Sequence, residues 1–156
     1  MNFAKLGQRL TDGLIGDDFD IYRSVFCLPL WIESRNGTPY EIETEEDLRQ
    51  DMALYVAAIQ IHRITDISRD IISVVELASD WVEVTTLTTF LSHGTLAVEP
   101  FRTQFVLRLT TDGWRIGAIR STLGHINWTL GRGTIEAMTF RPAPPNTRQT
   151  ERETRK

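Results

Sequence analysis

The chain has 156 residues, the length of one domain, and 41% of them are hydrophobic while 24% are charged. Seventeen Lys and Arg against 21 Asp and Glu give a net charge of −4, which argues against a cationic nucleic-acid-binding protein. The single cysteine, Cys27, excludes an intrachain disulfide and a multi-cysteine metal cluster. Because we find neither an export signal nor an apolar run of about 18 residues, we expect a cytoplasmic protein without a membrane partner.

The first third of the chain predicts three helices. Apolar residues recur at helical spacing over residues 3–14, and a shorter stripe over residues 19–26 follows a potential cap at Asp17 or Asp18. Thr44 and Asp47 resemble a capping box in front of a helix of about 18 residues. Its apolar face is formed by Leu48, Met52, Tyr55, Val56 and Ile59.

Strands are predicted by alternating patterns and turn dipeptides. Asn36-Gly37 predicts a hairpin between residues 28–34 and 38–43. After Thr65 the period becomes two, and turns at His93-Gly94 and Asp112-Gly113 separate segments 71–78, 81–91, 101–110 and 114–123. A weaker pair is expected within residues 124–140. The pattern predicts an α+β domain over residues 1–141 and a disordered tail over residues 142–156.

Two segments carry a family resemblance, GDDFDIYRSVFCLPLWIESRNGT near the start and EPFRTQFVLRLTTDGWRIGAIRS near the end. With the order of elements, they make residues 3–123 similar to the nuclear transport factor 2-like (NTF2-like) superfamily, and within it to the SnoaL-like group of small bacterial proteins. The resemblance implies a cone-shaped, curved antiparallel sheet wrapped around a long helix, also described as cystatin-like. It further implies an apolar pocket and a homodimer. Members include isomerases, dehydratases, epoxide hydrolases, cyclases and binding modules, so the fold does not decide the function.

The predicted hairpin at Asp112-Gly113 indicates which side chains face the pocket. A two-residue turn there places Phe105 opposite Arg120, and strict alternation then puts both on the inner face. Aromatic residues of the second and third helical patterns and of the first hairpin complete the expected lining. The residues expected to bind a ligand are Tyr22, Trp31, Tyr55, Thr103, Phe105, Leu107, Trp114 and Arg120.

Arg120 is the most informative residue of this set. On an apolar face a guanidinium needs a partner, because an unpaired buried charge is costly. One interpretation is that Arg120 binds a ligand carboxylate or phosphate. The alternatives are an internal ion pair with Glu33, Glu76 or another acid, or exposure near the end of the strand.

Two residues are candidates for acid-base catalysis. The resemblance implies that an isomerase of this superfamily has a carboxylate base after the first strand. Only Glu33 could take the role of that base in this sequence. His62 lies at the end of the long helix's apolar face with Asp66 four residues further on, which suits a pocket acid-base or a satisfied helix-terminal histidine. We expect neither a metal nor another cofactor. His62, Asp66 and Asp70 have the spacing of metal ligands on one face of a helix, but the helix is expected to end by Thr65.

The opposite face of the predicted sheet mixes apolar, Thr and Arg side chains. Its apolar members are Trp81, Leu87, Leu91, Val106 and Ile119. Such a mixed face suits packing against a second subunit, so we expect a homodimer. The alternative is that segment 124–140 or the tail folds over it. The leading functional hypothesis is a protein that binds a small apolar, possibly acidic, molecule in an enclosed pocket. The alternatives are a lyase or isomerase that uses His62 or Glu33, and an interaction module whose pocket is filled by its own side chains.

Overall fold

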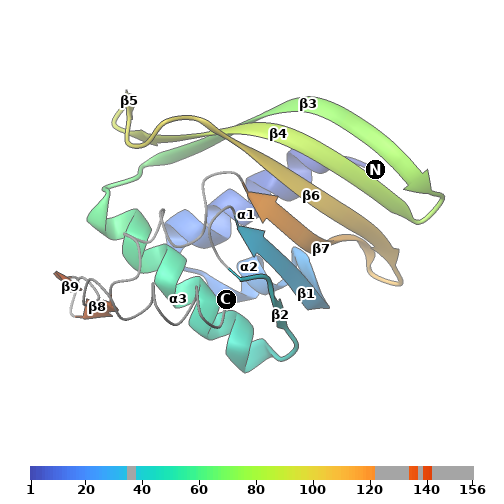
Figure 1. Cartoon of the computed structure of the whole chain (residues 1–156), viewed down its shortest axis with the longest axis horizontal. Coiled ribbons are helices and arrows are strands. Elements are labelled where there is room, and N and C mark those ends of the chain that lie inside the picture. The colour runs from blue at the N-terminus through green and yellow to red at the C-terminus, as the bar shows by residue number, and fades with distance from the viewer. Residues whose placement is uncertain (35–37, 122–133, 137–138, 142–156) are drawn as a thin grey trace.

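A computed structural model, drawn in Figure 1, describes residues 1–34, 38–121, 134–136 and 139–141. The three expected helices are confirmed as α1 (Phe3–Gly16), α2 (Phe19–Arg23) and α3 (Glu45–Ile61). A side-chain oxygen caps each N-terminus, because Asn2, Asp18 and Thr44 accept hydrogen bonds from the backbone N–H of the third residue beyond them.

A seven-stranded sheet forms the other layer, in the order β2-β1-β7-β6-β4-β3 with the short β5 paired to β4. Neighbouring strands are antiparallel except β1 and β7, which are parallel. The strands are β1 (Phe26–Ser34), β2 (Tyr40–Ile42), β3 (Asp66–Ala78), β4 (Trp81–Ser92), β5 (Thr95–Leu96), β6 (Phe101–Thr110) and β7 (Gly113–Ser121).

The sheet is curved, and the helices lie on its concave side (Figure 1). One buried apolar cluster joins the two layers, with Leu30, Leu48, Leu107 and Ile116 at most 1% exposed. Residues from β1, α3, β6 and β7 therefore meet in a single core. The expected α+β fold, a curved sheet around a long helix, is confirmed.

Helices α1 and α2 approach each other at Gly13. A Cβ atom at this position would lie 2.9 Å from the backbone nitrogen of Tyr22 and 3.0 Å from its Cα. Only a glycine permits this approach, which brings the Tyr22 ring into the core against Phe26 with 4.8 Å between ring centroids.

Strand β3 differs from the prediction in length and surroundings. It begins at Asp66 instead of residue 71, so Ile67 and Arg69 belong to the sheet. At its other end every residue from Asp70 to Ala78 is exposed, and the apolar ones among them are 46–54% exposed. These apolar residues, the β3 apolar segment, are Ile71, Ile72, Val74, Val75 and Leu77.

The β6–β7 hairpin corrects the predicted register. Thr111 and Asp112 form the turn, so Thr110 pairs with Gly113 and Leu107 with Ile116. Between Ile116 and Ala118 the register shifts by one, and Gly117 is the extra residue of a β-bulge. The bulge reverses the alternation beyond it, so that Ile119 and Ser121 face the helices, whereas strict alternation places Arg120 there.

Some expectations fall outside the described residues. The Asn36-Gly37 turn and the tail 142–156 are among them, as is most of segment 124–140. Within that last segment the described part is β8 (Thr134–Glu136) paired with β9 (Thr139–Arg141) in a separate two-stranded sheet. The turn at His93-Gly94 is confirmed, with positive φ at both residues.

Candidate functional site

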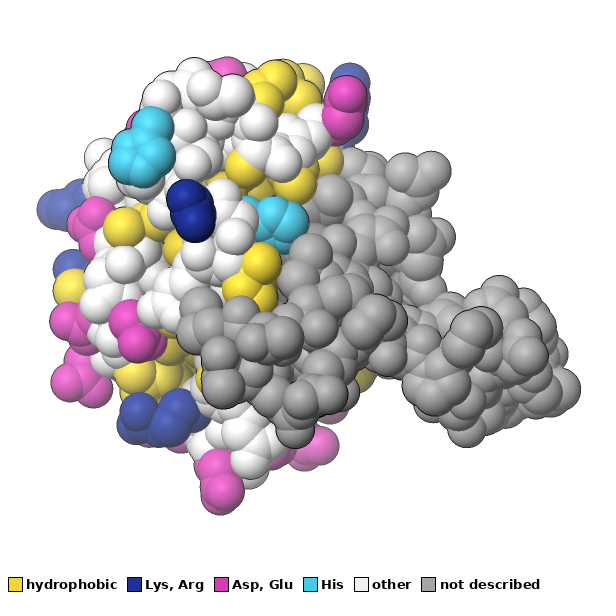
Figure 2. All heavy atoms as spheres, turned by 90° about the vertical axis from the view of Figure 1, so that its left-hand side faces the viewer, with side chains coloured by type: hydrophobic (Ala, Val, Ile, Leu, Met, Phe, Trp, Pro, Cys, Tyr) yellow, Lys and Arg dark blue, Asp and Glu magenta, His cyan; other side chains and the backbone are white. Residues whose placement is uncertain are grey.

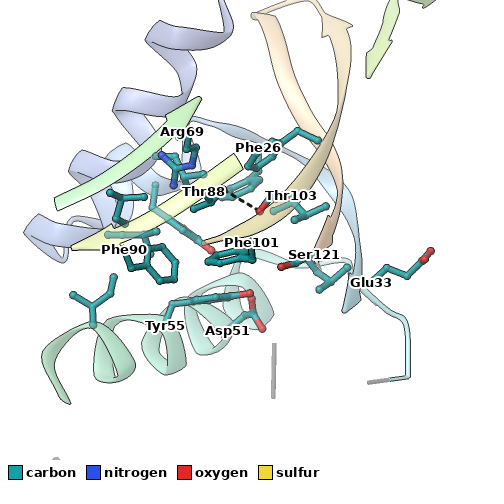
Figure 3. Close-up of a pocket in the computed structure, with 18 residues that line it drawn as sticks. Phe26, Glu33, Asp51, Tyr55, Arg69, Thr88, Phe90, Phe101, Thr103 and Ser121 are labelled. Atoms are coloured by element: carbon teal, nitrogen blue, oxygen red, sulfur yellow. Dashed lines mark hydrogen bonds between the residues drawn. The ribbon is translucent and has the colours of Figure 1, made fainter. Parts of the chain in front are cut away.

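A cavity of about 90 Å³ lies between the concave face of the sheet and the helices (Figure 3). Its wall is mostly apolar and aromatic, with Phe26, Phe90 and Phe101 among the labelled residues. Tyr55 and Asp51 extend from α3 toward the strands, and Arg69 enters from β3. The site therefore combines an apolar interior with a few polar groups, as small-molecule sites commonly do.

Two threonine hydroxyls form a polar strip on the strand side of the cavity. Thr88 Oγ1 and Thr103 Oγ1 are 3.1 Å apart, and Thr88 is 3% exposed. Thr86, buried beside them, has its hydroxyl 3.3 Å from that of Thr88. Because a hydroxyl can donate or accept and rotates freely, this strip can adjust to different polar groups of a ligand.

Among the described residues that line the cavity, Arg69 is the one with a cationic side chain. Its Nη1 donates to the carbonyl oxygen of Gly7 over 2.9 Å and to Thr11 Oγ1 over 2.6 Å, which ties β3 to α1. Burial lowers the pKa of the Arg69 guanidinium to about 10, so it remains charged at neutral pH. Strand register places Arg69 directly beside Thr88, so the charge lies next to the threonine strip.

Asp51 and three tyrosines form a second polar group on the α3 side. Tyr40 donates its hydroxyl to Asp51 Oδ1 over 2.8 Å, and Asp51 is 8% exposed. Burial raises the pKa of Tyr22, Tyr40 and Tyr55 well above the usual value for tyrosine, and the negative charge of Asp51 raises it further. These phenols therefore stay protonated near neutral pH and can act only as neutral hydrogen-bonding groups.

The structure brings part of the predicted ligand-binding set together. Tyr22, Tyr55, Thr103 and Phe105 all line the cavity. Leu107 is completely buried in the core and lies outside the cavity wall. Two tryptophans of the set are also outside it.

Of these two tryptophans, Trp31 is 37% exposed, and its indole Nε1 donates to Glu33 Oε1 over 2.9 Å. Trp114 lies at the start of β7, next to the turn, and packs against the core while partly buried. Trp31 is outside the cavity because side chains alternate along a strand, so that Trp31 points outward while its neighbours Leu30 and Ile32 face the core.

For Arg120 the structure contradicts the ligand-binding interpretation and agrees with the alternative, an ion pair with Glu33. Its side chain is 49% exposed and contacts Gln104, Glu33 and Glu83, with 3.7 Å between Arg120 Nε and Glu33 Oε1. The Gly117 bulge is responsible, because it turns Arg120 away from the helices. Glu33 borders the cavity, but its carboxylate points away from it, toward this ion pair (Figure 3).

His62 lies at the C-terminus of α3, where its backbone N–H donates to Ala58 O over 2.9 Å. It is half-buried and is not part of the cavity wall. Within the described ranges no group of three or more His, Cys, Asp or Glu residues is arranged to hold a metal ion.

The sequence interpretation missed Arg69 and Asp51, although both carry a signal. Arg69 lies two residues after Ile67, which is buried, so it belongs to the inward face of a strand once the strand is extended to Asp66. Asp51 lies three residues after Leu48 and four before Tyr55, which places it on the apolar face of α3.

On the surface, Figure 2 shows histidine side chains on the face turned to the viewer, apart from one another. Acidic and basic side chains are intermixed on the described part of this face. Among the described helices none combines the length and the hydropathy needed to cross a lipid bilayer.

Comparison with known proteins yields no match to a family model. It also yields no match among curated proteins. Solved structures do match.

An NTF-2-like protein of unknown function from Shewanella oneidensis is 13% identical, with a TM-score of 0.57 over 77% of this chain and 95% of that one. A putative dehydratase of the NTF2-like family from Streptomyces avermitilis is 16% identical, with a TM-score of 0.57 over 77% and 91% of the two chains. A Nostoc punctiforme domain of unknown function with a cystatin-like fold is 11% identical, with a TM-score of 0.58 over 96% and 80%.

Proposed function

The chain has the NTF2-like fold, and from this premise we propose that it binds a small, largely apolar molecule in the cavity between the sheet and the helices. The observation that carries the proposal is an apolar cavity with polar groups at a few fixed places, namely Arg69, Asp51 and the threonine strip. Such a combination provides affinity through apolar contact and orientation through hydrogen bonds. The NTF2-like superfamily, which the sequence resembles, includes binding modules besides enzymes.

Binding is favoured over acid-base catalysis because of where the candidate groups lie. The Glu33 carboxylate is paired with Arg120 and turned away from the cavity. His62 is outside the wall, and Asp51 already accepts a hydrogen bond from Tyr40. A lyase or isomerase needs a base within hydrogen-bonding reach of its substrate, and neither sequence candidate meets that condition in this arrangement.

The test is a chemical-shift titration of the isotope-labelled protein with butanoate, butanamide, benzoate and benzamide. We expect shifts concentrated at cavity residues. Ile67→Phe places extra volume in the cavity wall and should abolish them, while Ile15→Phe, on the exposed side of α1, should leave them unchanged. Leu14→Phe fills the cavity from the opposite wall and serves if Ile67→Phe does not fold. No shift at the cavity with any of the four probes contradicts the proposal.

We also propose that the partner of this chain is a second copy of it, which packs on the β3 apolar segment. The segment holds five of the large hydrophobic side chains that are most exposed among the described residues. It lies on the last strand in the sheet order, where unpaired backbone groups can add a strand from a neighbour. This moves the expected interface from the middle of the outer sheet face toward its edge, because Val106 is 7% exposed and Ile119 faces the cavity.

The oligomeric state tests this proposal through molar mass. Sedimentation should give twice the chain mass of 17.9 kDa for the unaltered protein. Val75→Lys puts a charge into the segment and should give the monomer, whereas Leu54→Lys replaces an equally exposed side chain on α3 and should give the dimer. A monomeric mass for the unaltered protein at every concentration contradicts it.

A further inference from the structure

We propose that the ligand carries a carboxylate and that the Arg69 guanidinium binds it. This inference rests on the binding function proposed above and deepens it by naming the chemical class of the ligand. It assigns to Arg69, on β3, the role that the sequence pattern suggested for Arg120.

The guanidinium of Arg69 is only partly satisfied by the protein. Both hydrogen bonds of the guanidinium are donated by Nη1, one to Gly7 O and the other to Thr11 Oγ1. In the part of the chain that the structure describes, Nε and Nη2 have no hydrogen-bond partner, and no carboxylate lies within 4.0 Å of Arg69. Because Arg69 is half-buried and its Nε and Nη2 meet no acceptor among the described residues, these N–H groups can donate to an incoming anion.

The two carboxylates that the described residues contribute to the cavity wall have other partners. Glu33 pairs with Arg120 on the other side of the sheet. Asp51 accepts the hydroxyl of Tyr40 and comes from α3, opposite the strand that carries Arg69. Neither lowers the charge that a ligand would meet at Arg69, and burial is accordingly the cause of the shift in the pKa of Arg69.

The neighbours of Arg69 suit a carboxylate with a short apolar chain. Thr88 is its direct cross-strand neighbour and is hydrogen-bonded to Thr103, so the hydroxyl of the pair that does not donate to the other can donate to an anion. Phe90 and Ile67, also in the wall, offer apolar surface for the chain. A cavity of about 90 Å³ is smaller than an engineered one of about 150 Å³ that holds benzene, so we expect short-chain acids to fit best.

The experiment compares each acid with its amide, which has the same shape and no charge. Butanoate should bind about tenfold to a hundredfold more tightly than butanamide, the range that a charge-assisted hydrogen bond provides. Benzoate and benzamide form a larger pair, expected to show the same preference with weaker binding. Arg69→Met should remove the preference, and Arg120→Met, which removes an exposed arginine of the outer face, should retain it. In the unaltered protein the Nε resonance of Arg69 should shift with the acid and not with the amide.

The outcomes separate this inference from the function on which it rests. Equal affinity for acid and amide in the unaltered protein overturns the carboxylate inference and leaves small-molecule binding intact. A preference that survives Arg69→Met, or disappears in Arg120→Met, overturns it as well. Failure of all four probes to bind contradicts the proposed function itself. If Arg69→Met does not fold, the Nε resonance of Arg69 in the unaltered protein provides the test. A resonance that does not shift when the acid is added overturns the inference.

Discussion

Glu33 and Arg120 form an ion pair across the parallel strands β1 and β7, with 3.7 Å between Glu33 Oε1 and Arg120 Nε. Both side chains are well exposed, at 39% and 49%, and the indole of Trp31 donates to the same carboxylate oxygen. The pair therefore belongs to the outer surface of the sheet. The residue that the sequence pattern placed at the polar end of the cavity and the residue it offered as a base bind each other there.

Loss of this pair should have little effect. We expect Glu33→Gln to lower the free energy of unfolding by less than about 1 kcal/mol, because exposed ion pairs are weak and screened by salt. Denaturant unfolding at low and at high salt measures this. A larger loss that persists at high salt contradicts the assignment of the pair to the surface.

Gly13 should not tolerate a side chain. In Gly13→Ala the new methyl group would lie within 3.1 Å of three atoms of Tyr22, two of them backbone, so α1 and α2 must separate. We expect a loss of about 1–3 kcal/mol, which exceeds the gain in helix propensity. The matched control is Gly16→Ala, where nothing lies within 4 Å, and thermal unfolding should show no loss. Equal stability of the two variants would refute the close approach.

The tyrosines predict the response to alkaline pH. The chain has three, and burial raises the pKa of each in the folded state, so the folded protein holds protons that the unfolded chain releases above pH about 10. The stability they contribute is complete below that pH and falls above it by up to about 1.4 kcal/mol per pH unit for each tyrosine.

A spectroscopic titration checks this sign. Tyrosinate absorbance should stay absent from the folded protein at pH about 11 and should appear together with the loss of helical circular dichroism. In denaturant all three tyrosines should titrate near pH 10. Tyrosinate formation at pH about 10 in the folded protein is the contrary result.

The hydrogen bond from Tyr40 to Asp51 should stabilise the contact between β2 and α3. Tyr40→Phe removes the hydroxyl and keeps the ring, and we expect a loss of about 1.5–3 kcal/mol, the range for a hydrogen bond to a charged group. Glu46→Gln, an exposed change in the first turn of the same helix, should cost less than about 1 kcal/mol. Urea unfolding compares the two variants, and a Tyr40→Phe variant as stable as the control would show that the bond contributes nothing.

Local sequence signals predicted the elements well, because the interactions that form them are local. The cap at Thr44 is made with Asp47 three residues away, and the turn at His93-Gly94 is fixed by the backbone freedom of its own residues. Beginning β3 at residue 71 was wrong by five residues. Arg69 interrupts the apolar pattern there, and its partners Gly7 and Thr11 lie about sixty residues away in sequence.

The sequence by itself determined that the chain forms an α+β domain and that Tyr22, Tyr55, Thr103 and Phe105 share one interior, since periodicity decides which face of an element is apolar. The curvature of the sheet was an implication of the family resemblance. Only the tertiary structure decided which arginine meets that interior. One bulge residue, Gly117, turns Arg120 outward, while the hydrogen bonds that Arg69 donates to α1 hold it in the cavity wall. Alternation along a strand has a period of two, so one inserted residue reverses every side chain beyond it, and the insertion shows only when the partner strand is in place.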